Sequence, residues 1–309
     1  MSKFLVTGGA GFIASHIVER LVKDGHVVRV LDNLFSGKKE NISAVLKDIE
    51  FINGDIRDFE AVKKATEGMD YVLHHAALRS VPGSFKNPEE YNEVNIAGTL
   101  NLLKASVNNN IKRFVFASSS AIYGDTDKSP QRESDLPRLI SPYALNKLAG
   151  EYYCRIFSHS YGLETVSLRY FNVFGPKQAP DDEYAGVVPK FIICMLNNQA
   201  PPIYGTGKQS RDFVYIDNIV EANILAASQK GLKCEVVNIG CGRADTILEL
   251  VKVLNSLMNK SLKPIFDKPR PGDVLRTLSD ISLAKKVLGY KTKIDLKEGL
   301  RRTISWFQK

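Results

Sequence analysis

The chain has 309 residues, of which 44% are hydrophobic and 25% are charged, an ordinary composition for a globular protein. This composition excludes a disordered or fibrous chain, and the length predicts about two domains. The net charge is +8, but the basic residues form nothing denser than short pairs along the sequence. That pattern argues against a nucleic-acid-binding surface and favours attraction of small anions.

The sequence gives no sign of a membrane or secreted protein. Its apolar runs are too short to span a bilayer, and its N-terminus lacks the apolar segment of a signal peptide. The cysteines form no Cys-x-x-Cys pair and no metal-like cluster with histidine; they are Cys154, Cys194, Cys234 and Cys241. We therefore expect free thiols, no metal site and a cytoplasmic location.

Strand-like and helix-like segments alternate through the first half of the chain. The expected strands are Lys3–Thr7, Val27–Asp32, Glu50–Asn53, Tyr71–His75, Arg113–Ala117 and Glu164–Tyr170. The expected helices are Ile13–Lys23, Phe59–Glu67, Pro88–Asn108 and Pro142–Ser160. This alternation predicts an α/β fold, with a doubly wound parallel sheet (Rossmann) that is covered on both faces.

Proline and glycine interrupt the pattern from Phe171 onward. We expect two further helices, near Ile216–Ser228 and Ile247–Met258. A segment near 212–240, with the strand-like Val236–Ile239, is expected to return to the main sheet. The sequence therefore predicts a Rossmann domain, 1–171, and a smaller C-terminal α/β substrate domain, mainly 172–309, over the carboxyl edge of the sheet.

The N-terminal segment 4–14 has the order strand, glycine turn, helix. Gly8, Gly11 and Ala14 follow a G-x-x-G-x-x-A pattern, in which glycines let the backbone approach a pyrophosphate at a helix N-terminus. Asp32 ends the next strand, about 20 residues on, where a carboxylate binds a ribose diol. That carboxylate would repel a 2′-phosphate, so we expect NAD rather than NADP, although Lys38 and Lys39 act in the opposite sense. A plain glycine turn is the alternative.

Tyr143 and Lys147 stand at i and i+4, so one helix face would carry both. An ammonium beside the phenol would lower the tyrosine pKa from about 10 toward neutrality and make it a general base. A run of serines, 118–120, follows an expected strand. Taken singly, an exposed helical pair and a polar loop explain these features better. Their combination with the dinucleotide motif favours catalysis.

With these motifs the sequence resembles the extended short-chain dehydrogenase/reductase family, and within it the NAD-dependent nucleotide-sugar epimerases. The resemblance covers essentially the whole chain. The matching segments are 7–13, 32–34, 54–56, 75–77, 95–99, 118–124, 143–147, 169–172, 211–212 and 270–273.

The resemblance implies a role for each matching residue. The catalytic residues would be Ser119, Tyr143 and Lys147. The NAD-binding residues would be Gly8, Gly11, Phe12, Ile13, Asp32, Asn33, Ser36, Gly37, Asp55, Ile56, Ala76, Ala77, Arg79, Asn95, Tyr143, Lys147 and Phe171. The residues that bind a UDP-sugar would be Ser119, Tyr143, Asn172, Val188, Tyr204, Arg211, Arg270, Asp273 and Thr277. Arginine suits a diphosphate because its planar fork pairs two oxygens at once.

The reaction within the family is indicated by what two positions lack. Dehydratases carry an Asp-Glu pair just after the catalytic residue, and uronate decarboxylases carry a Glu at the second position. Here these positions are Ser120 and Ala121, which leaves C4 epimerisation, an isomerase activity. Alternatives are a UDP-uronate 4-epimerase, another NAD-dependent nucleotide-sugar-modifying enzyme, or an NAD-sensing regulator that would lack the Tyr/Lys/Ser set.

Two finer expectations concern substrate size and assembly. In the epimerases that the chain resembles, the residue seven positions after the Arg of the Arg-x-Gly-Asp motif borders the sugar pocket, and a bulky Tyr there would exclude an N-acetyl group. The resemblance places the small Thr277 at this position and so implies activity on UDP-GlcNAc and UDP-GalNAc as well as UDP-Glc and UDP-Gal. The helices 88–108 and 142–160 resemble those of the family's dimer bundle. Candidate dimer-face residues are Leu100, Leu102, Leu103, Tyr152 and Ile156, with intramolecular core as the equal alternative. The expected partners are thus a UDP-sugar and a second copy of the chain, without nucleic acid or membrane.

Overall fold

The computed structural model describes residues 1–179, 186–269 and 274–308. Within these ranges, seven parallel strands form one sheet in the order β11-β6-β5-β4-β1-β2-β3. The strands are β1 (Lys3–Thr7), β2 (Val27–Asp32), β3 (Ile49–Asn53), β4 (Tyr71–His74), β5 (Arg113–Ser119), β6 (Glu164–Tyr170) and β11 (Cys234–Ile239). The expected doubly wound parallel sheet is therefore confirmed.

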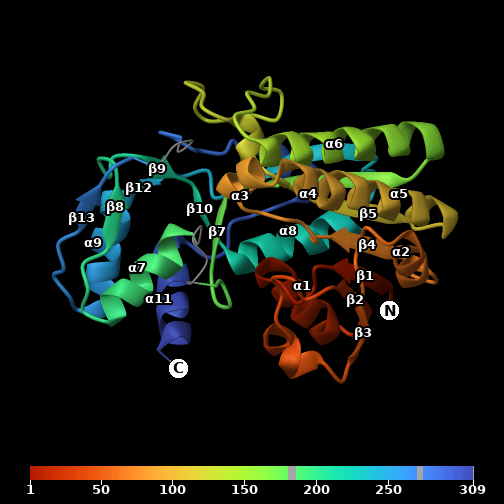
Figure 1. Cartoon of the computed structure of the whole chain (residues 1–309), viewed down its shortest axis with the longest axis horizontal. Coiled ribbons are helices and arrows are strands. Elements are labelled where there is room, and N and C mark those ends of the chain that lie inside the picture. The colour runs from red at the N-terminus through yellow and green to blue at the C-terminus, as the bar shows by residue number, and fades with distance from the viewer. Residues whose placement is uncertain (180–185, 270–273, 309) are drawn as a thin grey trace.

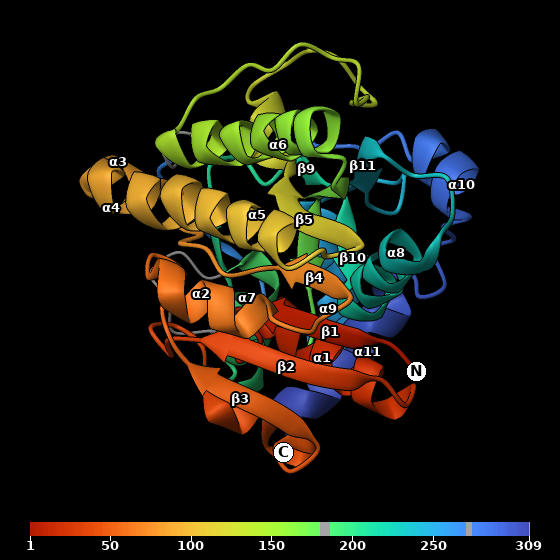
Figure 2. The same ribbon diagram turned by 90° about the vertical axis from the view of Figure 1, so that its right-hand side faces the viewer.

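Helices cover both faces of this sheet (Figure 2). One face carries α2 (Phe59–Thr66), α5 (Gly98–Asn108) and α6 (Pro142–Tyr161); the other carries α1 (Phe12–Lys23) and α8 (Ile216–Ser228). Because the strands are buried on both faces, they read as nearly continuous apolar runs. The strand order reverses between β1 and β4, and ligands of such folds bind at this reversal, outside the carboxyl ends of the strands.

The expected helix Pro88–Asn108 is helical over its whole length, but it is not α-helical throughout. A helix α3 (Val81–Lys86) precedes it, and α4 (Pro88–Asn92) passes through a π-helical turn, Glu93–Ala97, into α5. Asn95 lies in this turn, and its buried amide bonds to the backbone of Leu78 at 2.8 and 2.9 Å. Such turns often mark functional sites, and this one ties the helix to the segment after β4.

Much of the second half of the chain forms a separate lobe of helices and short strand pairs (Figure 1). Its helices are α7 (Val187–Leu196), α9 (Ile247–Met258) and α11 (Leu296–Phe307), whereas α10 (Ser282–Leu288) packs against α8 and β11 beside the main sheet. Its strand pairs are β7 (Asn172–Phe174) with β10 (Phe213–Tyr215), β8 (Pro202–Tyr204) with β13 (Ile265–Asp267), and β9 (Ser210–Arg211) with β12 (Asp245–Thr246). The division of the chain at residue 171 stays a prediction, and β11 crosses it by pairing with β6.

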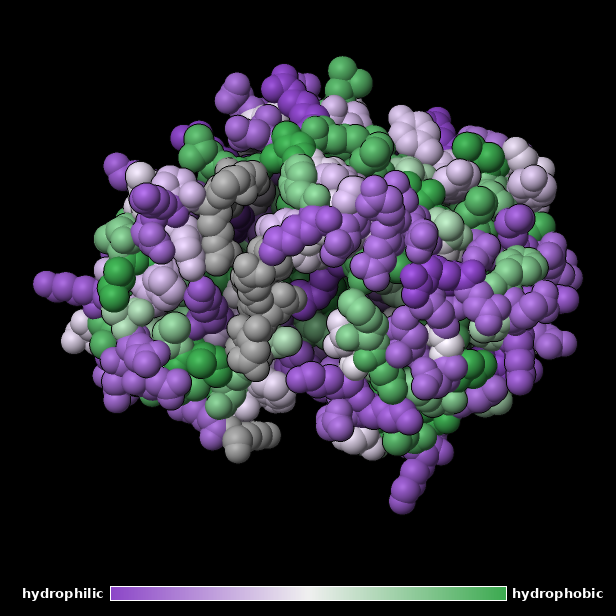
Figure 3. Space-filling view, in the orientation of Figure 1, coloured by the Kyte–Doolittle hydropathy of each residue, from purple (hydrophilic) through white to green (hydrophobic). Residues whose placement is uncertain are grey.

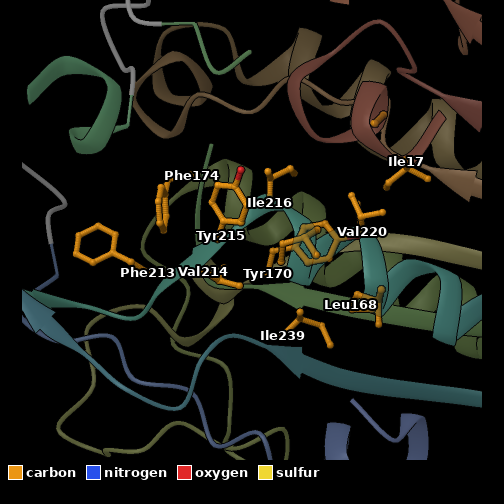
Figure 4. Packing of buried hydrophobic residues seen from close by; sticks show 14 of the residues in the cluster. Ile17, Leu168, Tyr170, Phe174, Phe213, Val214, Tyr215, Ile216, Val220 and Ile239 are labelled. Atoms are coloured by element: carbon orange, nitrogen blue, oxygen red, sulfur yellow. The ribbon is translucent and has the colours of Figure 1, made fainter. Parts of the chain in front are cut away.

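One apolar cluster runs from the sheet into the second half (Figure 4). Ile17 of α1 and Leu168 of β6 belong to it, together with Phe174, Val214 and Ile216 from the β7–β10 region. All five side chains are at most 2% exposed. The two halves therefore share a core, which fixes the second half against the carboxyl edge of the sheet.

The surface of the molecule carries both hydrophilic and apolar side chains. The face seen in Figure 3 is covered mostly by hydrophilic side chains, with apolar residues scattered among them. None of the helices in the described ranges is long and apolar enough to cross a membrane.

Candidate active site

A cleft of about 780 Å³ lies at the carboxyl ends of the strands, within the usual size range of ligand pockets. Most of the residues predicted to bind NAD line it. They are Gly8, Gly11, Phe12, Ile13, Asp32, Asn33, Ser36, Gly37, Asp55, Ile56, Ala76, Ala77, Arg79, Tyr143 and Lys147. The sequence motifs, which are scattered over the first half of the chain, therefore meet in one place.

The glycine turn after β1 leaves no room for side chains. Gly8 has a φ of +67°, and a Cβ there would lie 2.8 Å from the backbone nitrogen of Ala76. A Cβ on Gly11 would lie 3.0 Å from the carbonyl oxygen of Gly8. The N-terminus of α1 opens into the cleft, and among the described residues no side chain caps it. This bare, close backbone fits a pyrophosphate.

Besides lining the cleft, Asp32 stabilises the glycine loop through hydrogen bonds that the motif did not predict. Its carboxylate is 7% exposed and accepts hydrogen bonds from the backbone of Ala10 at 2.9 Å and of Leu34 at 2.8 Å. Burial raises the pKa of this carboxyl, while the two backbone bonds oppose the rise. Asp32 thus holds the glycine loop in shape while it lines the cleft, where its position fits a ribose diol.

The far end of the cleft is organised by Asp55. This carboxylate accepts a hydrogen bond from Asn33 at 2.9 Å and pairs with Arg57 at 2.8 Å. The guanidinium of Arg57 holds the pKa of Asp55 at about 2. Both Asn33 and Asp55 line the cleft, so their polar atoms fit the adenosine end of a dinucleotide.

Two predicted NAD residues are placed behind the cleft wall. Asn95 is 2% exposed and binds the backbone of Leu78, so it holds the cleft-lining segment 76–79 in place. Phe171 is 3% exposed and packs near Tyr123, with ring centroids 6.1 Å apart. Both residues are therefore buried next to the cleft and do not line it.

Tyr143 and Lys147 share one face of α6, as their spacing predicts. Ser141 caps this helix by accepting a hydrogen bond from Ala144 at 3.2 Å. Lys147 is 5% exposed, and its Nζ donates to the carbonyl of Ala117 at 2.8 Å. Ser119 ends β5 close to Tyr143, and the hydroxyl interaction between these two residues favours the phenolate.

The expected fall in the Tyr143 pKa is wrong for this structure. Burial raises the pKa of the phenol, and the opposing effects come from Ser119 and Arg79. Burial also lowers the pKa of the Lys147 ammonium to about 8, against the attraction of Glu151. The spacing argument placed the two groups correctly but left out desolvation, which disfavours the charged form of each.

A buried ion pair that the sequence analysis missed lies beneath α6. Glu151, one turn after Lys147, pairs with Arg169 of β6 at 2.8 Å. It also accepts a hydrogen bond from Ser118 at 2.5 Å. Arg169 donates in turn to Tyr123 at 2.9 Å. The i+4 spacing of Glu151 from Lys147 was the available signal, and these contacts lock α6 onto β5 and β6.

Several residues predicted to bind the UDP-sugar come together in the second half. The amide of Asn172 donates to the hydroxyl of Thr277 at 3.0 Å, and the backbone of Thr277 binds Ser210 at 3.1 Å. Arg211, beside Ser210 in β9, is 9% exposed. These residues therefore form one cluster around β9.

The remaining substrate residues are more scattered. Tyr204 ends β8, and its hydroxyl accepts a hydrogen bond from Lys190 at 3.1 Å. Val188 is 2% exposed and packs into the apolar core from α7. Arg270 and Asp273 lie outside the described residues.

The cleft also has walls that no motif indicated. Lys177 and Gln178 reach it from the second half, and Trp306 reaches it from α11. These three residues are distant in sequence from the glycine motif, so only the fold shows that they share its site. His75, from the matching segment 75–77, lines the cleft as well, with its Nε2 3.0 Å from the hydroxyl of Tyr170.

Comparisons with known proteins agree with this geometry. The family model described as "NAD dependent epimerase/dehydratase family" matches residues 4–240. A solved UDP-N-acetylglucosamine 4-epimerase from Methanobrevibacter ruminantium M1, in complex with UDP-N-acetylmuramic acid, is 43% identical with a TM-score of 0.95, over 99% of this chain and 98% of that one.

Two further solved structures are similar over the whole length. The UDP-glucose 4-epimerase of Thermotoga maritima with UDP-glucose is 40% identical with a TM-score of 0.94, over 99% of this chain and 98% of that one. The UDP-glucose 4-epimerase of Thermus thermophilus, in complex with NAD, is 39% identical with a TM-score of 0.90, over 99% of both chains.

Proposed function

The chain belongs to the NAD-dependent epimerase/dehydratase family, and we propose that it is an isomerase that inverts C4 of UDP-hexoses with bound NAD. The observation that carries the proposal is the meeting of Tyr143, Lys147 and the glycine turn in one cleft. Bound NAD would accept the hydrogen of C4 as hydride and give it back. The residues of the chain have to move a proton, orient the sugar and hold the cofactor.

Tyr143 is the group that moves the proton. Its phenolate would take the proton of the C4 hydroxyl as the bond to hydrogen breaks, and return it when the carbonyl at C4 is reduced. Ser119 favours the phenolate, and Lys147 is held against Ala117 with its ammonium over the ring of Tyr143, 5.9 Å from the centroid. Ser120 and Ala121 offer no carboxyl for dehydration or decarboxylation.

The UDP moiety is assigned to the second half of the chain. We propose that Asn172, Val188, Tyr204, Arg211 and Thr277 bind the substrate, together with Arg270 and Asp273. The cluster around β9 supports this, because it combines a guanidinium with amide and hydroxyl groups. The similar chains from Methanobrevibacter and Thermotoga are complexes with UDP-sugars.

The size of residue 277 is the proposed reason for a broad sugar range. We infer activity on UDP-GlcNAc and UDP-GalNAc as well as on UDP-Glc and UDP-Gal, because Thr277 is small. In Thr277→Tyr, turnover of the N-acetylated sugars should fall much more than that of UDP-Glc, since overpacking a site costs about 1–3 kcal/mol. Thr277→Val is the control for size, because it replaces the hydroxyl that accepts from Asn172 and from the backbone of Asp212 by a methyl group of similar volume.

The experiment that tests the function is product analysis by NMR. Purified protein without added NAD is incubated separately with UDP-Glc, UDP-GlcNAc and UDP-glucuronate. We expect C4-inverted products from the first two. Dehydration at C4 and C6 or release of carbon dioxide as the main reaction would contradict the proposal, and inversion of UDP-glucuronate alone would favour the uronate 4-epimerase.

We also propose a homodimer in the cytoplasm. Leu145, Tyr152 and Ile156 form an apolar stripe along α6, each at least half exposed, and Phe85 of α3 is 58% exposed. The free state of the four cysteines fits a reducing compartment. Among the dimer candidates, Leu102 and Leu103 are fully buried in the core between helices and sheet, so for those two the alternative of intramolecular core holds.

A further inference from the structure

The segment 175–179 leaves β7 in the second half and lies against the N-terminal half. The side chain of Lys177 is 14% exposed, and its Nζ lies 2.7 Å from the carboxylate of Glu19 on α1. The same Nζ donates to the carbonyl of Asn41 at 2.7 Å. His16 of α1 donates to the carbonyl of Pro176 at 3.0 Å. Three contacts therefore join the two halves at this point.

The backbone at Lys177 is adapted to this contact. Its φ is +65°, in the left-handed region that non-glycine residues seldom occupy. Such a conformation persists where surrounding contacts over-determine it. Here the ion pair to Glu19 and the bond to Asn41 supply those contacts.

The contact lies at the wall of the cleft. Lys177 and Asn41 both line it, whereas Glu19 stands outside. An epimerase of the proposed kind takes its hydride back, so release of NAD between turnovers brings it no advantage. We propose that Lys177, by bridging Glu19 and Asn41, is a latch that keeps NAD in the cleft between turnovers. This inference rests on the NAD dependence of the proposed function.

A simpler role makes the opposite prediction for one variant. If Lys177 only attracted the diphosphate of NAD, Glu19 would compete for its charge, and Glu19→Gln would slow the release of NAD. If Lys177 is a latch, Glu19→Gln breaks the latch from its other side and speeds release. The sign of the Glu19 effect therefore separates the two roles.

The chain carries its own probe, because its single tryptophan, Trp306, lines the cleft. Protein loaded with NADH, which absorbs the indole emission, is mixed with excess NAD, and the recovery of Trp306 fluorescence gives the release rate. The variants are Lys177→Met, Lys177→Arg, Glu19→Gln and the Lys177→Met/Glu19→Gln pair. No UDP-sugar is present, so the result does not depend on the sugar chemistry.

We expect release at least about tenfold faster in Lys177→Met, as for the loss of a charged hydrogen bond. Glu19→Gln should also speed release, the pair should be no faster than Lys177→Met, and Lys177→Arg should stay near wild type. Unchanged release in Lys177→Met, or slower release in Glu19→Gln, would overturn the latch. A wild type whose fluorescence does not respond to NADH would contradict the NAD dependence itself.

Discussion

At the scale of single residues, Tyr143 and Lys147 are both buried, and burial disfavours the charged form of each side chain. Burial favours the neutral phenol of Tyr143 and the neutral amine of Lys147, and specific contacts oppose it. The sequence could predict the identity and common face of these residues, because helical spacing is local. It could not predict the sign of the Tyr143 pKa change, because desolvation depends on packing by distant segments.

Replacing the Tyr143 oxygen should remove the base and little else. We expect Tyr143→Phe to keep its fold and its NAD content but to lose about 10²–10⁴-fold or more in kcat. Steady-state kinetics and NAD content after denaturation measure this. Tyr152→Phe, which removes a half-exposed phenol from the same helix, is the control and should match wild type. A Tyr143→Phe variant with near-normal turnover would show that another group is the base.

The buried charge of Lys147 should lower the stability of the protein, although the activity needs this residue. Its pKa falls from 10.5 to about 8 on folding, which corresponds to a burial cost of roughly 3 kcal/mol. Lys147→Met removes this cost but also the bond to Ala117, so we expect a net gain of about 1–2 kcal/mol in unfolding free energy, with loss of activity.

The difference in unfolding free energy between wild type and Lys147→Met should depend on pH. Below pH 8 both states hold the Lys147 proton and the cost is fully present. Between about pH 8 and 10.5 only the unfolded chain binds the proton, so wild-type stability relative to Lys147→Met rises with pH. Urea unfolding at several pH values measures the difference. A variant that is less stable than wild type at pH 7 would contradict the assigned burial cost.

At the scale of elements, α6 lies so close to the sheet that one of its positions has no room for a side chain. A Cβ on Gly150 of α6 would be 2.3 Å from the ring of Phe116 in β5. The same ring lies under Lys147, with Nζ 5.0 Å from its centroid. This close approach brings Lys147 within reach of the Ala117 carbonyl, so the helix–sheet distance is part of the site.

Filling that contact should move the helix. We expect Gly150→Ala to lower the unfolding free energy by about 1–3 kcal/mol and to reduce kcat, although alanine favours helices over glycine by about 1 kcal/mol. Adding Phe116→Leu should recover part of the stability, because it makes room for the methyl group. Thermal unfolding and kinetics check this. A stabilised single variant would refute the close-packing argument.

The elements of the first half could be predicted because each carries a periodic apolar pattern and its own turn residues. The exceptions are short. They are α3, the 3-10 helices Lys39–Val45 and Ser120–Tyr123, and the π-helical turn, in which Asn95 makes tertiary bonds to Leu78. In the second half, α7, α10, α11 and the short strand pairs were not predicted. Strands of two or three residues leave too few side chains for a periodic signal, and contacts such as Asn172–Thr277 join positions 105 residues apart.

At the scale of the whole molecule, the two halves share one core and meet over the cleft. The exposed stripe on α6 is the surface that we assign to a second copy of the chain, because exposed apolar patches mark interaction sites. We expect a dimer in analytical ultracentrifugation, and a monomer for Tyr152→Glu/Ile156→Glu, because buried charges would face each other across the two-fold axis. A wild type that sediments as a monomer at micromolar concentration would contradict the homodimer.

In the proposed reaction, the hydrogen at C4 leaves the sugar as hydride and returns to it within one active site. UDP-glucose labelled with deuterium at C4 tests this return, with enzyme that carries its own NAD and none added. We expect UDP-galactose that keeps the deuterium at C4, by NMR and mass spectrometry. Epimerised product with protium from the solvent at C4 would contradict it, because the inversion would then proceed without hydride return.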